Sequence, residues 1–144
     1  MRVFALAIGL TIASWSIAGC AAEARAPEPV PLDRVECSRC RMLVSTESGS
    51  AQIVAAADQT RFYDDIGCLA ADWRAHTTDA TPFLHVSGEW GDARTAFFAQ
   101  PVDARTAMGS GFLAYASAAE ARAADRAGRA LTWDEVVELA GAGR

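Results

Sequence analysis

Residues 60–75 have the sequence TRFYDDIGCLAADWRA, which decides the fold because it predicts a strand followed directly by a helix. The segment 60–63 combines β-branched and aromatic residues, a composition typical of strands. Asp65 is a residue type that caps helix N-termini. Over residues 66–75, apolar side chains recur at i, i+3, i+4 and i+7, which predicts a helix with one apolar face. A strand joined to a helix in this way indicates a mixed fold.

Two short segments upstream supply partners for this strand. Residues 41–45 (RMLVS) and 52–56 (QIVAA) lie on either side of the turn-forming sequence ESGS at residues 47–50. Short runs of this composition, bounded by turn residues, favour strands. We therefore expect an antiparallel meander of three strands that leads into the helix.

The remainder of the chain repeats the order of strands and then helix. Residues 83–86 and 95–99 are apolar segments that predict strands. Ser117 and Thr132 are each followed three residues later by glutamate, the pattern of a capping box, so a helix is expected to begin at each. The first of these helices should end near Gly128, because glycine commonly terminates helices.

The predicted fold class is α+β, with two similar small halves that each contain antiparallel strands around a short helix. The halves would cover about residues 35–78 and 79–144. Removal of a 19-residue signal from the 144 residues would leave 125, enough for one compact unit with a hydrophobic core. One folded domain over residues 35–144 is therefore expected.

The first 20 residues, MRVFALAIGLTIASWSIAGC, have the layout of a secretory signal. Arg2 gives a positive start, and the apolar run at residues 3–12 is too short for a transmembrane helix, which needs about 20 apolar residues. The sequence IAGC at residues 17–20 resembles a bacterial lipobox, in which Cys20 is lipidated and becomes the first residue of the mature protein. The alternative is an ordinary signal peptide with a chance cysteine.

These features predict a lipoprotein signal peptide at residues 1–19 and a lipidated tether at residues 20–34. The tether contains AAEARAPEPVP, a composition that suits extended chain. Lipid would anchor the protein to a membrane of the bacterial cell envelope, with the folded part facing the periplasm or the exterior.

The formal net charge is −5 and all 13 basic residues are arginine. An acidic chain without a basic stripe argues against nucleic-acid binding.

The sequence CSRCRM at residues 37–42 places two thiols and a thioether within six positions. On a strand, Cys40 and Met42 would point to the same face with their Cα atoms about 7 Å apart. Cys37 lies across a turn and can fold over the same point. Thiolate and thioether are soft donors that select Cu(I), whereas methionine is not a usual ligand of zinc.

Several other roles remain open for these residues on spacing alone. An exported Cys-x-x-Cys pair is also consistent with a disulfide or a thiol redox couple, and a methionine on a strand is most often a core residue. Cys68, on the apolar helix, is more often core than part of a site. Asp64 and Asp65 are more often capping residues than ligands of a hard cation.

The wider sequence resembles the NosL family, the copper-binding lipoproteins that serve nitrous oxide reductase. The lipobox ending at Cys20 is one element of this likeness. Four further blocks occur in the family's order and spacing: CSRCRMLVS at 37–45, FYDDIGCL at 62–69, WGDARTAFF at 90–98 and AMGSGFLAY at 107–115.

The resemblance implies a fold of two similar α+β halves and a role in denitrification. The protein would bind Cu(I) and deliver it to the copper–sulfide centre of nitrous oxide reductase, without being an enzyme itself. The family's Cys-x-Met ligands fall on Cys40 and Met42. Cys37 matches the other motif cysteine, and Met108 matches the methionine of the last block and is a candidate third ligand.

The chain departs from the family pattern inside the first block. Ser38 stands where the family has proline, and Arg41 where it has glycine. If the family needs glycine at that position for a positive φ, the loop geometry should change. The guanidinium of Arg41 would also favour thiolate at Cys40. A membrane-anchored thiol–disulfide oxidoreductase that uses Cys37 and Cys40 is the alternative function.

Overall fold

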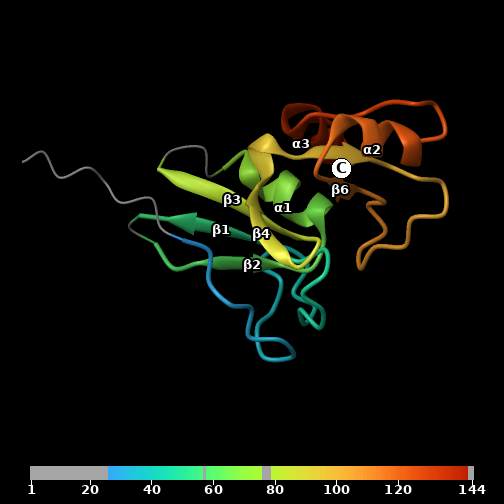
Figure 1. The fold of residues 1–144 in the computed structure, drawn as a ribbon. Coiled ribbons are helices and arrows are strands. Elements are labelled where there is room, and N and C mark those ends of the chain that lie inside the picture. The colour runs from blue at the N-terminus through green and yellow to red at the C-terminus, as the bar shows by residue number, and fades with distance from the viewer. Residues whose placement is uncertain (1–25, 57, 76–78, 143–144) are drawn as a thin grey trace, which may run out of the picture.

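The computed structural model describes residues 26–56, 58–75 and 79–142. The expected signal peptide and Cys20 lie outside the described residues. The largest element is an antiparallel sheet with the strand order β2-β1-β3-β4 (Figure 1). Its strands are β1 (Ala51–Ala55), β2 (Arg61–Tyr63), β3 (Ala80–Val86) and β4 (Glu89–Asp92).

Strand β1 is one of the two interior strands of this sheet, because both of its edges are paired. Ala51 is opposite Tyr63 of β2 and opposite Leu84 of β3. Four of its five residues are buried, which explains why the segment is almost entirely apolar. Strand β4 continues the sheet beyond β3, with His85 opposite Trp90.

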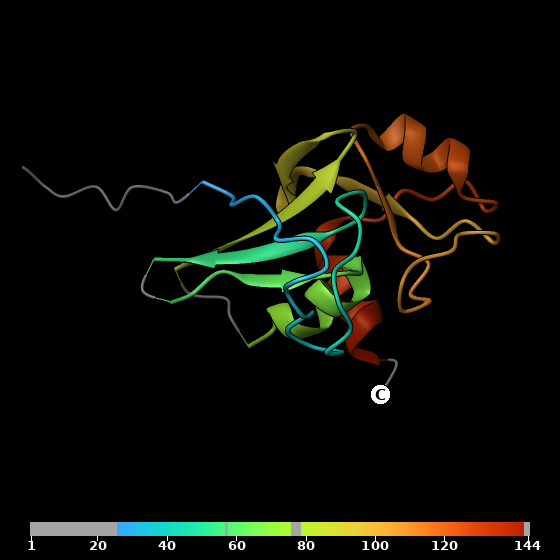
Figure 2. The same cartoon turned by 90° about the horizontal axis from the view of Figure 1, so that it is seen from below.

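Helix α1 (Ile66–Trp73) follows β2 directly. Asp65 is its N-cap, and the Oδ1 atom of Asp65 accepts a 2.6 Å hydrogen bond from the backbone N–H of Gly67. Figure 2 shows α1 lying beside α3 (Trp133–Ala142) next to the sheet. The indole rings of Trp73 and Trp133 join the two helices, with their centroids 6.4 Å apart.

A second, two-stranded sheet pairs β5 (Phe97–Ala99) with β6 (Leu113–Tyr115). The 3₁₀ helix η1 (Ala93–Thr95) leads into β5, and α2 (Ala118–Ala124) follows β6. Phe98 packs on Trp133, with ring centroids 5.8 Å apart, so the small sheet shares the core of the larger one. The loop at residues 100–112 that joins β5 to β6 approaches the N-terminus of α1.

The structure confirms the α+β class and most of the local predictions. Strands occur within or overlapping 52–56, 60–63, 83–86 and 95–99, and the helix expected at 66–75 is α1. Ser117 forms the predicted capping box with Glu120. In the box at Thr132, the backbone N–H of Thr132 donates a 2.7 Å hydrogen bond to Glu135.

Two local predictions are wrong. Residues 41–45 contain only an isolated bridge between Glu36 and Leu43, not a strand. Helix α2 ends at Ala124 rather than near Gly128. It ends there because Asp125 has an extended conformation, in which its carboxylate accepts the backbone N–H groups of Ala127 and Arg129.

The division into two similar halves is not confirmed. Strands β3 and β4 follow residue 78, yet they extend the sheet built on β1 and β2. The larger sheet therefore draws strands from both sides of the expected boundary. Among the described residues, no helix is long and apolar enough to cross a membrane.

Candidate metal centre

Four side chains from two distant segments meet beside the N-terminus of α1. They are Cys37, Cys40, Asp64 and Cys68, and their sulfur atoms and carboxylate oxygen all lie within 4.8 Å of one another. We call this group the thiol cluster. All three cysteines are free thiols. Two of the four, Cys37 and Cys40, were expected to act together; Asp64 and Cys68 were not.

The N-terminal part of the cluster is a tight turn rather than a strand. The backbone N–H of Cys37 donates to the carbonyl of Met42 at 2.7 Å, and the N–H of Arg41 donates to the carbonyl of Cys37 at 3.0 Å. Arg41 has a φ of 68°, in the left-handed region, so an arginine adopts the conformation that favours glycine. The backbone N–H of Ser38 donates to the carbonyl of Phe62 at 2.8 Å, which fastens the turn to β2.

The other part of the cluster comes from the junction of β2 and α1. Asp64 precedes the N-cap residue Asp65, and Cys68 lies in the first turn of α1. Asp64 lies outside the helix, because the N-cap Asp65 has an extended backbone. The junction of strand and helix nevertheless brings Asp64 and Cys68 together beside Cys37 and Cys40. Their closeness in sequence, around a predicted helix start, was the signal that could have found them.

The cluster has a buried side and an accessible side. Cys37 is fully buried and Cys68 is buried, whereas Cys40 is only half-buried. The Sγ atom of Cys40 lies 3.4 and 3.5 Å from the two carboxylate oxygens of Asp64. A cleft of about 800 Å³ opens beside Cys40 and Cys68 and is also lined by Arg39, Met108 and Leu139. This cleft gives an ion or a partner's ligand a route to the sulfur of Cys40.

The thiols have very different proton affinities. A hydrogen bond with Cys68 is the main cause that lowers the pKa of Cys37 to about 4, and the same contact raises the pKa of Cys68. Burial raises the pKa of Cys40 to about 11. Burial, followed by the hydrogen bond and negative charge of Cys37, raises the pKa of Asp64 to about 6. Of the three thiols, Cys37 therefore loses its proton most readily.

Backbone N–H groups surround the sulfur of Cys37. Those of Cys40, Asp64 and Arg39 form hydrogen bonds to Cys37 and lower its pKa, and that of Met42 does the same for Cys40. Amide donors directed at sulfur stabilise thiolate over thiol. The local fold therefore prepares a thiolate ligand.

The two methionines proposed as ligands are both exposed. Met42 is 51% exposed on the turn, and Met108 is 46% exposed on the wall of the cleft. The argument that Cys40 and Met42 share a strand face does not apply, because residues 41–45 are not a strand. Their roles as ligands remain predictions.

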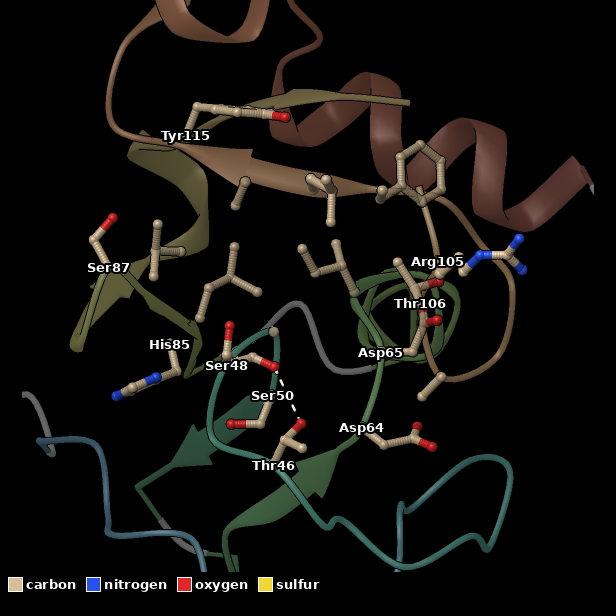
Figure 3. A pocket seen from close by; sticks show the side chains of 18 residues that line it. Thr46, Ser48, Ser50, Asp64, Asp65, His85, Ser87, Arg105, Thr106 and Tyr115 are labelled. Carbon is tan, nitrogen blue, oxygen red and sulfur yellow. Dashed lines mark hydrogen bonds between the residues drawn. The ribbon is translucent and has the colours of Figure 1, made fainter. Parts of the chain in front are cut away.

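A second cavity of about 370 Å³ lies on the other side of Asp64 and Asp65 (Figure 3). Figure 3 shows the hydroxyl-bearing side chains of Thr46, Ser48 and Ser50 gathered at one wall, while Arg105 extends away from its centre. None of the described cysteines lines this cavity. The soft-ligand chemistry is therefore confined to the cleft side.

Comparison with models of known protein families finds no match. Searches of curated proteins and of solved structures also find no match.

Proposed function

We propose that this protein is a lipid-anchored Cu(I) carrier that supplies copper to an exported copper enzyme. The single observation that carries the proposal is the convergence of the sulfur atoms of Cys37, Cys40 and Cys68 within 4.8 Å. Cu(I) prefers soft thiolate ligands. As a d¹⁰ ion it has no strong geometric demand, and two or three thiolates complete its coordination.

The unequal exposure of the three thiols suits a carrier rather than a permanent store. Buried Cys37 and Cys68 hold the ion from the protein side, and half-buried Cys40 faces the cleft. A receiving protein can place its own soft ligand beside Cys40 and displace the chain's thiolates one at a time. The exposed thioether of Met108 lines this cleft and is suited to brief contact with the departing ion, and Met42, exposed on the turn, is a further soft ligand close to Cys40 in the sequence.

The client and the location come from the resemblance to the NosL family. By that resemblance the receiving enzyme is nitrous oxide reductase, and the carrier does no catalysis. Lipid at Cys20 would hold the protein at the membrane, facing the periplasm or the exterior. The expected tether at residues 20–34 is packed on the domain at its end, where Val30 is buried in the core and the backbone N–H of Glu28 donates to Gln52 at 2.9 Å. Only the part of it before Glu28 would act as a tether that lets the cluster reach a client beside the membrane.

The test is a Cu(I) titration of the reduced full chain against a chromophoric Cu(I) chelator. We expect a 1:1 complex, and we expect Cys37→Ser, Cys40→Ser and Cys68→Ser each to weaken binding by tenfold or more. Met42→Ala and Met108→Ala should slow transfer to an acceptor more than they weaken equilibrium binding. Binding by all three serine variants as tight as that of the wild type would show that the thiol cluster is not the copper site.

A second candidate function, thiol–disulfide exchange, is favoured by the same proximity of sulfur atoms and by the low pKa of Cys37. A thiolate next to a second thiol is the arrangement that exchange requires. Equilibration in glutathione buffers, followed by alkylation and mass analysis, tests it. A reversible disulfide with a potential near that of known exchange proteins supports this candidate, and failure to exchange removes it.

A further inference from the structure

Asp64 is the member of the thiol cluster that Cu(I) carriage does not explain. A carboxylate is a hard oxygen ligand, whereas Cu(I) is satisfied by thiolates. Zn²⁺ differs because it accepts cysteine sulfur and aspartate oxygen in one four-coordinate site. We propose that four side chains also form a tetrahedral binding site for Zn²⁺, a divalent d¹⁰ ion. The ligands of this site are Cys37, Cys40, Cys68 and Asp64. This inference rests on the same thiol cluster as the proposed function.

The distances in the cluster fit a tetrahedron. With bonds of about 2.3 Å to sulfur and about 2.0 Å to oxygen, tetrahedral ligands lie about 3.5 Å apart for a sulfur–oxygen pair and about 3.8 Å for two sulfurs. The sulfur of Cys40 lies 3.4 and 3.5 Å from the two oxygens of Asp64, so this edge is already formed. No pair of ligand atoms is farther apart than 4.8 Å, so the remaining edges need to contract by about 1 Å at most between two sulfurs and by about 1.3 Å at most between sulfur and oxygen.

Charge also favours a divalent ion when Asp64 is a ligand. Three thiolates and one carboxylate carry four negative charges, of which Zn²⁺ neutralises two and Cu(I) only one. Uncompensated charge is expensive at a site where Cys37 is fully buried. The backbone N–H groups around Cys37 spread the remaining charge, as the outer hydrogen bonds of metal–thiolate sites do. Arg39 on the cleft wall adds a positive group nearby.

The simpler account of Asp64 is that it only accepts a hydrogen bond from the Cys40 thiol. That bond is present in the structure. It is compatible with the proposal, because binding of Zn²⁺ displaces the Sγ protons of Cys40 and Cys68 to solvent. The carboxylate oxygen then faces the ion instead of the proton. The two accounts make different predictions for the affinity of the protein for Zn²⁺ and for Cu(I) when the Asp64 carboxylate is removed.

The experiment compares the reduced full chain with Asp64→Asn, which keeps the shape of the side chain and lacks the carboxylate. Zn²⁺ affinity is measured against a chromophoric chelator, Co²⁺ serves as a spectroscopic probe of tetrahedral thiolate coordination, and Cu(I) affinity is measured in parallel. Asp92→Asn, which removes a carboxylate outside the cluster, is the matched control. We expect Asp64→Asn to weaken Zn²⁺ binding tenfold or more, to shift the ligand-field bands of the tetrahedral Co²⁺ spectrum and to change Cu(I) affinity less than threefold.

Two outcomes overturn the proposal: unchanged Zn²⁺ binding in Asp64→Asn, or an equal loss of Zn²⁺ and Cu(I) binding in a folded variant. If Asp64→Asn does not fold, a crystal structure of the zinc-loaded wild type decides. An Asp64 oxygen at about 2.0 Å from the ion supports the site, and a water in its place overturns it. Loss of Cu(I) binding with retention of Zn²⁺ would refute copper carriage and leave this inference intact.

Discussion

The carboxylate of Asp65 joins the start of α1 to Met108, which lies 43 residues farther along the chain. Its Oδ2 atom accepts a 2.9 Å hydrogen bond from the backbone N–H of Met108, while Oδ1 caps the helix at Gly67. Asp65 is itself buried. Because Asp64 and Cys68 lie on either side of this cap, one side chain sets the position of both the cleft wall and half of the thiol cluster.

Substitution Asp65→Ala should therefore lower the free energy of unfolding by more than the loss of a cap alone. We expect about 1 kcal/mol for the cap and about 1–2 kcal/mol for the unpaired N–H of Met108. Urea denaturation measures the loss. Ser117→Ala, which removes the exposed cap of α2, is the control and should cost about 1 kcal/mol. Equal losses in the two variants would contradict a linking role for Asp65.

Two glycines that lie in helices should respond in opposite ways to substitution by alanine, one with a loss of stability and the other without. A Cβ added at Gly67 would lie 2.5 Å from the Cβ of Ser110, on the loop that Asp65 anchors, whereas at Gly141 it would meet only the flexible guanidinium of Arg74. Gly67→Ala should cost about 1–3 kcal/mol through overpacking, and Gly141→Ala should be neutral or stabilise by up to about 1 kcal/mol. Thermal unfolding of both variants makes the comparison. If both substitutions stabilise the protein, the loop that carries Ser110 can move away from the added Cβ at little cost.

The backbone conformation of Arg41 predicts a stabilising substitution within the turn at residues 37–42. A non-glycine residue at a φ of 68° carries strain of about 1 kcal/mol, which Arg41→Gly should relieve. The variant also loses the 2.9 Å ion pair between Arg41 and Glu36, but both side chains are largely exposed and such pairs contribute little. We expect a net gain of about 0.5–1 kcal/mol in urea denaturation. Arg39→Gly is the control, because Arg39 has no positive φ, and a gain there instead of at Arg41 would refute the strain argument.

Features set by neighbouring residues were predictable from the sequence. The helix after Asp65 and the capping boxes at Ser117 and Thr132 depend on side chains within one turn, and all three occur. The conformation of residues 41–45 was not predictable, because their composition favoured a strand, whereas Arg41 adopts a left-handed conformation and the segment forms only an isolated bridge. The pairing of β1 with β3 was also hidden, because it joins segments about 30 residues apart.

Only half of the candidate site could be predicted from the sequence, for the same reason. Cys37 and Cys40 are close in sequence and their spacing identified them as a pair. Asp64 and Cys68 had local roles that explained each of them, as a cap and as a core residue. Their contribution to the thiol cluster appears only when the turn at residues 37–42 is fastened to β2 by the hydrogen bond from Ser38 to Phe62.

The last prediction concerns the protons of the thiol cluster. Because the hydrogen bond with Cys68 lowers the pKa of Cys37 to about 4, thiolate absorbance near 240 nm should rise by one equivalent as the pH of the reduced, metal-free protein increases through about 4. Cys40 should ionise only near pH 11, because burial raises its pKa. Cys68→Ala removes the hydrogen bond and should move the first step to higher pH. A first step above pH 8 in the wild type would contradict this arrangement, because it would mean that Cys68 does not stabilise the thiolate of Cys37.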